Sequence, residues 1–220
     1  MTRIAGRIAL LSVLLVPLTA ASSGGWATVT VEDLPDYFTA GQPVNVAFTI
    51  RQHGQELMEG LKPAIEAQAG KLEARAQAAP GKSRGTYVAR IVLPQPGTWT
   101  LTIRSDFGKY SDVALLPIQA IAPGAALAAL SDMERGKRLF VAKGCFTCHQ
   151  RTDVKGAGKI DVGPTLSGRV LAADYVKRVL ADPSIVQNKV GPTRMPNLNL
   201  KEREIASLAA FVSTPSHASR

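Results

Sequence analysis

The sequence predicts two domains behind an N-terminal leader: an all-β sandwich over residues 28–118 and an all-α domain over residues 131–214, with a short tail at 215–220. Apolar side chains alternate with a period of two in the first region and recur at spacings of three and four in the second. Charge separates the same two regions. Residues 28–130 carry nine basic and nine acidic side chains, whereas residues 131–220 carry fifteen basic and eight acidic ones.

Residues 119–130 are expected to link the two domains. The stretch holds small or apolar, uncharged side chains, and Pro123-Gly124 interrupts it, which is typical of a linker of limited stiffness. A helical turn at its C-terminal end is the alternative.

Residues 1–27 are typical of a secretory signal peptide. Two arginines precede an apolar run over residues 8–18, which is too short to span a bilayer comfortably. Cleavage after Ala21 and cleavage after Ala27 are both possible, because small residues occupy the first and third positions before each of these points. The extended stretch that begins at Thr28 favours cleavage after Ala27. We therefore expect export to the periplasm and no transmembrane segment in the mature chain, with an uncleaved anchor as the alternative.

Short β-strands are expected where β-branched and aromatic residues alternate with polar ones, at residues 28–32, 44–50, 87–93, 98–103 and 113–118. Short strands at this spacing indicate an antiparallel sandwich of immunoglobulin type. Residues 60–80 fit either a strand or a helix, and the breaks at Pro63 and Gly70 favour strand and loop.

Three helices are expected in the second domain. The first covers residues 132–143, because Ser131 and Glu134 form a capping box before it and Gly144 suits its end. The second covers residues 172–181, where Asp182-Pro183 ends it.

The third helix follows Asn199 as its N-cap and stops before Pro215. Gly136 lies inside the first helix, where a glycine costs about 1 kcal/mol relative to alanine. Close approach of the third helix would compensate for that cost, so we expect these two helices to pack together.

Residues 145–149 read C-x-x-C-H, the attachment motif of a c-type haem. In that chemistry the thiols of Cys145 and Cys148 add across the porphyrin vinyl groups, and His149 binds the iron. A redox disulfide and half a zinc site are the alternatives. They are disfavoured because the chain has no other cysteine, because His53 and His217 are distant in sequence, and because a helix precedes the motif. One covalent haem c is the expected cofactor.

Around this motif the second domain resembles the class I cytochromes c. The resemblance covers the first helix, the C-x-x-C-H motif, Gly-Pro-Thr-Leu at residues 163–166, the middle helix, Arg-Met-Pro-Asn-Leu at residues 194–198 and the final helix. It implies an all-α class I cytochrome c fold. It also implies that the Pro164 carbonyl accepts a hydrogen bond from His149, that Leu166 packs against the haem, and that Met195 is the second axial ligand of the iron.

A methionine is more often core filler than a ligand, but Met195 lies in a polar, proline-rich stretch and its soft thioether suits ferrous iron. The less favoured candidates for the same position are Met58, Met133, His53 and His217.

The strand-turn-strand sequence at residues 85–101 resembles exported immunoglobulin-like domains found beside copper-handling and oxidase-assembly proteins. His53 and Met58 lie five residues apart with no third soft ligand evident, so copper binding is disfavoured. The expected role of this domain is that of a spacer or docking module.

These observations predict a periplasmic one-electron carrier, not an enzyme, that docks on a larger redox complex and associates with the membrane only through it. The basic second domain would be steered toward acidic faces of redox partner proteins, although a diffusely basic surface is the alternative. Nucleic acid is not an expected partner, since no basic-aromatic pattern occurs. A haem-based sensor, a copper or oxidase assembly factor and, last, a peroxidase are the alternative functions. The sequence does not set the oligomeric state.

Overall fold

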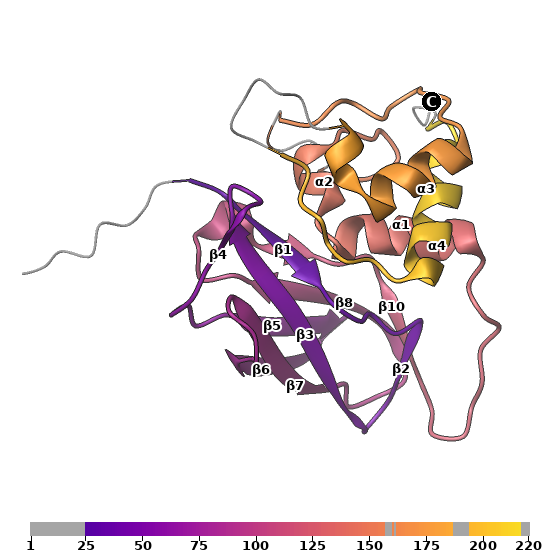
Figure 1. Ribbon diagram of the computed structural model, residues 1–220. Helices are drawn as coiled ribbons and strands as arrows, with labels where there is room; N and C mark the ends of the chain where they lie inside the picture. The colour runs from indigo at the N-terminus through magenta and orange to yellow at the C-terminus, as the bar shows by residue number, and fades with distance from the viewer. Residues whose placement is uncertain (1–24, 157–159, 161, 187–193, 217–220) are drawn as a thin grey trace, which may run out of the picture.

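The computed structural model describes residues 25–156, 160, 162–186 and 194–216, and Figure 1 shows a β-rich region beside a group of helices. Most of the expected leader, including Ala21, lies outside these residues, as does His217. Within the part of the chain that is described, no helix is both long and apolar enough to cross a membrane.

The first region is all-β, as the alternation of its side chains predicts. Its strands are β1 (Ala27–Val31), β2 (Tyr37–Thr39), β3 (Pro43–Gln52), β4 (Glu56–Leu57), β5 (Ala64–Ala69), β6 (Leu72–Pro80), β7 (Thr86–Val92), β8 (Gly97–Arg104), β9 (Val113–Ala114) and β10 (Ile118–Ile121), with a 3-10 turn η1 at Lys109–Ser111. Residues 60–80 are strand and loop, as expected, and Gly70 supplies the left-handed turn (φ 60°) between β5 and β6.

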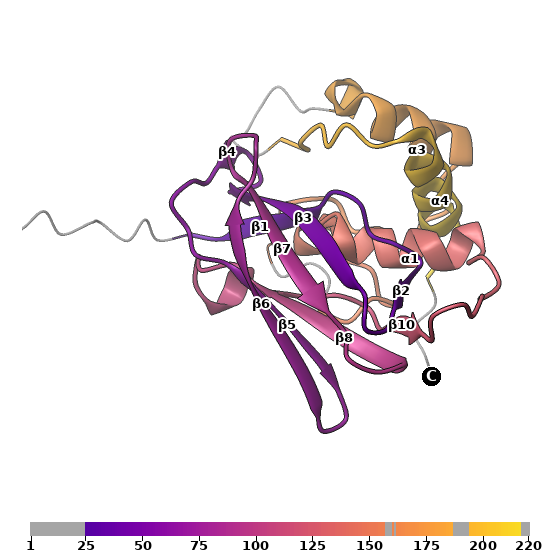
Figure 2. The same cartoon turned by 90° about the horizontal axis from the view of Figure 1, so that it is seen from below.

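The strands form one path in the order β1-β3-β7-β6-β5-β8-β10-β2, with β4 paired to β3 and β9 to β8. All pairs are antiparallel except β10 with β2. In Figures 1 and 2, β1 and β3 lie on one side of the core and β5 and β8 on the other. Trp99, Phe48 and Tyr87 are among the large side chains that fill it.

The expected linker is shorter than predicted, because strand β10 takes in residues 119–121. Ile118, Ala120 and Ile121 are buried, and Gln119 and Ala120 pair with β8. The predicted boundary after residue 118 falls inside this strand, because a short strand between two others is defined by its partners and not by its own periodicity. Residues 122–130 contain no helix.

The helices of the second region are α1 (Asp132–Ala142), α2 (Cys145–Cys148), α3 (Ala173–Ala181) and α4 (Glu202–Ser213), with a 3-10 turn η2 at Pro183–Val186. The predicted capping box is present: Ser131 Oγ accepts the Glu134 N–H, and the Glu134 carboxylate accepts the Ser131 N–H. Asn199 is not the N-cap of α4. It has a left-handed φ of 49°, and α4 begins after Lys201, whose N–H donates to the Glu204 side chain.

Helices α1 and α4 pack together where Gly136 faces Ser207. A Cβ on Gly136 would lie 2.0 Å from the Ser207 carbonyl oxygen, so only glycine allows this approach. Next to this point the rings of Phe140 and Phe211 meet edge to face with centroids 5.6 Å apart. The close packing offsets the intrinsic cost of a glycine in a helix.

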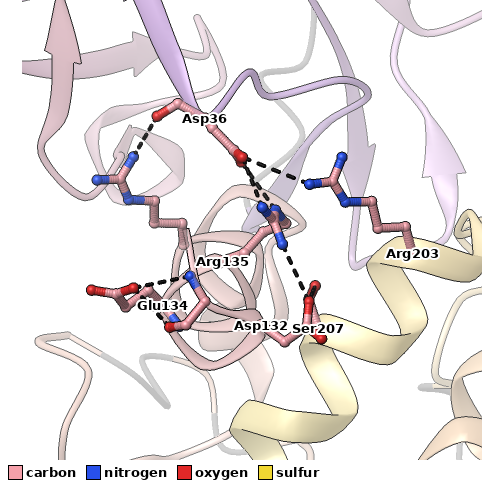
Figure 3. A network of polar contacts seen from close by, with 8 residues as sticks. Asp36, Asp132, Glu134, Arg135, Arg203 and Ser207 are labelled. Carbon is pink, nitrogen blue, oxygen red and sulfur yellow. Dashed lines mark hydrogen bonds and ion pairs between the residues drawn. The ribbon is translucent and has the colours of Figure 1, made fainter. Parts of the chain in front are cut away.

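Charged groups of the second region are joined to the loop that follows β1. Arg135 of α1 donates two hydrogen bonds to the Asp36 carboxylate, 3.0 Å and 2.8 Å long, and its side chain is only 11 % exposed. Arg138 donates to the Asp36 carbonyl, and Arg203 of α4 lies 3.8 Å from the carboxylate. Figure 3 shows Asp36 between these side chains. The bonds from Arg135 lower the pKa of Asp36 below its usual value.

Lys143, directly after α1, joins the same two regions in the interior. Its ammonium lies 2.7 Å from the Glu204 carboxylate of α4 and donates to the Glu32 carbonyl at the end of β1. The Thr30 hydroxyl of β1 donates to the Lys143 carbonyl. A buried ammonium is tolerated because both charge and hydrogen bonds are satisfied. The helices therefore pack on the edge of the sheet at β1, and the apolar core is continuous from one region to the other.

Replacing Gly136 with alanine should force α1 and α4 apart. We expect Gly136→Ala to lower the free energy of unfolding by about 3 kcal/mol, the cost of overpacking at a rigid backbone contact. Chemical denaturation of the full chain measures it, with Lys137→Ala on the same helix as the control. Equal stability of the two variants would contradict the close approach.

Asp36→Asn should lower the free energy of unfolding by about 2 kcal/mol at pH 7, because it removes the charged acceptor from the largely buried Arg135 side chain. Since the pKa of Asp36 is lowered on folding, its contribution is complete above the usual value of 3.8 and is lost as the pH falls through the lowered value. The difference from the unmodified chain should shrink there. Asp174→Asn, at an exposed pair on α3, should show neither effect.

Candidate haem-binding site

The C-x-x-C-H motif forms helix α2 and its C-cap, directly after the turn at Lys143-Gly144 that follows α1. Gly144 is the N-cap of α2, with a left-handed φ of 78°, and a Cβ there would lie 2.8 Å from the Val29 carbonyl oxygen of β1. Both facts require glycine. Cys145 and Cys148 begin and end this single helical turn, so their side chains share one face. His149 follows in extended conformation.

The elements around the two cysteines differ from those around a redox disulfide, although one feature of such a site, a helix that begins at the first cysteine, is present. Helix α2 does begin at the first cysteine, but helix α1 and not a strand precedes it. Both cysteines are free thiols, and burial raises the pKa of Cys145 to about 12 and that of Cys148 to about 11. In this fold both thiols are protonated at neutral pH, which makes them poor nucleophiles for disulfide exchange.

His149 is held by the Gly-Pro-Thr-Leu segment. Its Nδ1 lies 3.0 Å from the Pro164 carbonyl oxygen, the contact that the cytochrome resemblance predicts. Two backbone bonds flank this contact, because the Gly163 N–H donates to the Cys148 carbonyl and the Leu166 N–H donates to the Gln150 carbonyl. The segment therefore runs beside the end of the motif and fixes the orientation of the ring.

The protonation state of His149 follows from the same contacts. Burial lowers the pKa of the imidazole, while the bond to the Pro164 carbonyl opposes that shift in part. The ring is thus neutral at pH 7. A carbonyl only accepts, so the proton lies on Nδ1 and the Nε2 lone pair is left for a metal.

Leu166 and Met195 are half-buried and, like Cys145, pack against the apolar core that runs through both regions. The other described candidates for the second axial position are Met58, Met133 and His53. Met58 packs in the β-sandwich, and Met133 is 38 % exposed at the start of α1. His53 lies in the turn between β3 and β4, with its ring 5.6 Å from that of Trp26.

The donor set fits a c-type haem. Two free thiols lie one helical turn apart, a neutral imidazole offers Nε2, and the helical region also holds the half-buried thioether of Met195. Cys145, Cys148 and His149 would hold the group from one side, with Pro164 orienting the histidine. Among the described residues, no group of three or more His, Cys, Asp and Glu side chains could hold a metal ion, so a zinc site finds no support there.

Sequence reasoning missed Arg151, which fastens the motif to the end of α4. Its side chain is buried, donates to the carbonyls of Val212 and Thr214, and lies with its guanidinium carbon 4.0 Å from the centroid of the Phe211 ring. A cation is favourable at the carbonyl end of a helix. An arginine in a basic region of the sequence predicts a solvent-exposed side chain. The contact of Arg151 with the end of α4 is therefore evident only from its burial in the fold.

Gly163→Ala should disturb the support of His149. The new Cβ would lie 2.8 Å from the imidazole and 2.9 Å from the Cys148 carbonyl, so the segment or the ring must move. We expect the free energy of unfolding to fall by about 2 kcal/mol. We also expect either less covalent haem, measured as its pyridine adduct, or a high-spin absorption spectrum of the untreated protein. Thr165→Ser, at an exposed position of the same segment, is the control. An unaltered low-spin spectrum in Gly163→Ala would contradict the arrangement.

Comparison with solved structures gives only distant similarity. Domains 1–6 of the surface layer protein SbsC are 19% identical with a TM-score of 0.35, and the match covers 44% of this chain and 13% of theirs. The ZirS C-terminal domain is 8% identical over 55% of this chain and 86% of its own, with a TM-score of 0.32. The Escherichia coli adhesin FdeC is 18% identical over 44% of this chain and 32% of its own, with a TM-score of 0.31. The match thus spans a small part of SbsC. The comparison with curated proteins found no match to this chain.

The helical region matches a known family. The model of the Cytochrome c family matches residues 133–216, which include the C-x-x-C-H motif, the Pro164 segment, Met195 and helix α4. Together with the free thiols and the oriented imidazole, this match makes the second region a cytochrome c domain, and it supports a haem-binding role in electron transfer.

Proposed function

We propose that this protein is an exported one-electron carrier that binds one haem covalently through Cys145 and Cys148, with His149 and Met195 as axial ligands. The observation that carries the proposal is the bond between His149 Nδ1 and the Pro164 carbonyl, because it leaves Nε2 of a neutral imidazole free in the residue that directly follows the two-thiol turn. When bound, haem would supply one-electron chemistry between ferrous and ferric iron.

The chain's own residues would set the conditions for that chemistry. The thioether of Met195 is a soft donor, which stabilises ferrous iron and raises the reduction potential. Buried apolar residues of α1 and α4 exclude water from the site, which reduces the reorganisation that each electron transfer demands. Pro164 keeps His149 in one tautomer through the cycle. Such a carrier needs no residue to activate a substrate.

Basic side chains would guide docking onto an acidic redox partner. The described part of the second region exposes Lys155, Arg169, Lys177, Arg178, Arg194 and Arg203. Such a surface raises the association rate with an acidic face, and the effect weakens with ionic strength. The acidic partner belongs to a larger redox complex in this proposal.

The β-sandwich also bears on where the leader is cut. Ala27 is the first residue of β1, is buried, and donates its N–H to the Ser111 hydroxyl. The Trp26 carbonyl accepts the His53 N–H. Cleavage after Ala27 would remove both contacts, so we propose cleavage after Ala21 instead, within a periplasmic export route.

Met195→Ala tests the axial ligand. The chain is produced in a host that matures c-type haem. Mass spectrometry of the unmodified exported chain should then show the added mass of one haem, and the same measurement shows after which residue the leader is cleaved. Met195→Ala should keep that haem, because both thiols remain, but should lose the methionine-to-iron charge-transfer band of the ferric form and have a lower potential. The control is Met133→Ala, an exposed methionine of the same domain.

Two results would overturn the proposal. One is a colourless unmodified protein without added haem mass. The other is a Met195→Ala spectrum identical to that of the unmodified protein. Fast binding of carbon monoxide to the ferrous unmodified chain would indicate a haem-based sensor instead, because a carrier with six ligands on iron resists it.

A further inference from the structure

The β-sandwich contacts the segments that carry the proposed haem ligands, not only the far side of the helices. Strand β1 lies against Gly144, directly before Cys145. Beyond that point, two of its loops contact residues 194–201, the segment that carries Met195 and leads into α4. A spacer would need none of these contacts.

One contact lies next to Met195 itself. The Gln55 side chain donates a short hydrogen bond to the carbonyl of Arg194. That carbonyl and the Met195 N–H belong to one planar peptide unit. A donor fixed on the carbonyl therefore restricts the backbone from which the Met195 side chain projects.

Gln55 is well placed to act as such a donor because its turn is rigid. The Gln55 N–H donates to the Gln52 carbonyl, and the His53 N–H donates to the Trp26 carbonyl. His53 and Gly54 both adopt left-handed conformations, with φ of 51° and 71°, which close the turn between β3 and β4. The His53 ring also packs edge-on against Trp26.

The other end of the segment is tethered as well. Lys201 pairs with Asp33, which follows β1, and Glu204 one turn later forms the buried pair with Lys143. The Lys201 pair is exposed and contributes little by itself. The buried pair anchors the segment where α4 begins. Between the two ends, Met195 and Leu200 pack against the core.

We propose that the β-sandwich clamps the Met195 segment and that Gln55 is a positioning residue for the second axial ligand, an inference that rests on the proposed function. An axial thioether is a weak ligand that dissociates and rebinds, and a tether at Arg194 disfavours the dissociated state. The clamp lowers the population that external ligands can reach, and so lowers their apparent affinity by the same factor.

Gln55→Glu and Gln55→Ala test this in the full-length haem-loaded protein. Glutamate keeps the size of the side chain but has no donor for the Arg194 carbonyl at neutral pH. Both variants should bind imidazole to the ferric form about three- to tenfold more tightly than the unmodified chain, the effect of one lost hydrogen bond. The ferrous forms should bind carbon monoxide correspondingly faster.

The matched control is Gln68→Ala on β5, an exposed glutamine whose amide makes only a 3.5 Å contact to the nearby Gly70 carbonyl. It should leave imidazole affinity unchanged. The free energy of unfolding should be the same for Gln55→Ala and Gln68→Ala within about 1 kcal/mol, which separates positioning from general destabilisation.

The outcomes separate the clamp from the function on which it rests. If the unmodified chain carries haem and its methionine band, but the Gln55 and Gln68 variants bind imidazole equally, the clamp is overturned and the carrier stands. If the unmodified chain lacks covalent haem, the carrier itself fails and the clamp with it. A rise confined to the Gln55 variants supports the inference.

Discussion

The close approach of α1 to α4 at Gly136 is the contact on which the rest of the second region depends. It brings the Ser207 backbone to the surface of α1 and sets Phe140 against Phe211. From the same crossing follow two anchors of the haem motif, since Arg151 reaches the carbonyl end of α4 and Lys143 reaches its first turn. A wider crossing would cost both cations their partners on α4, a penalty larger than that of the glycine.

The two regions share an interface of a kind that fixes geometry more than it adds stability. Charged groups across it, such as Arg135 on the Asp36 carboxylate and Lys143 on the Glu32 carbonyl, lose hydration when they are buried, so their net contribution is small even where their geometry is good. A wrong orientation would leave these charges unpaired, however, and that penalty is large. The continuous apolar core supplies the driving force, and the ion pairs select one arrangement of helices against β1.

The candidate site joins this scaffold to a few local contacts. The Pro164 carbonyl selects the tautomer of His149, and Gly144 and Gly163 give the backbone the room that a side chain would fill. These contacts come from segments close in sequence to the motif. The segment that carries Met195 is different, because the Arg194 carbonyl accepts its hydrogen bond from Gln55, which lies 139 residues away along the chain.

Local chemistry by itself determined the elements and the motif: the period of two in the strands, the capping box at Ser131, the C-x-x-C-H spacing and the glycine that demands a close partner are all readable in short windows. Tertiary structure alone decided that residues 119–121 complete a strand, that α4 starts after Lys201, and that Arg151 and Gln55 support the site. The reason is physical. Periodicity and capping report energies within a few residues, whereas a short strand, a buried cation or an interdomain hydrogen bond depends on which distant group meets it once the core has formed.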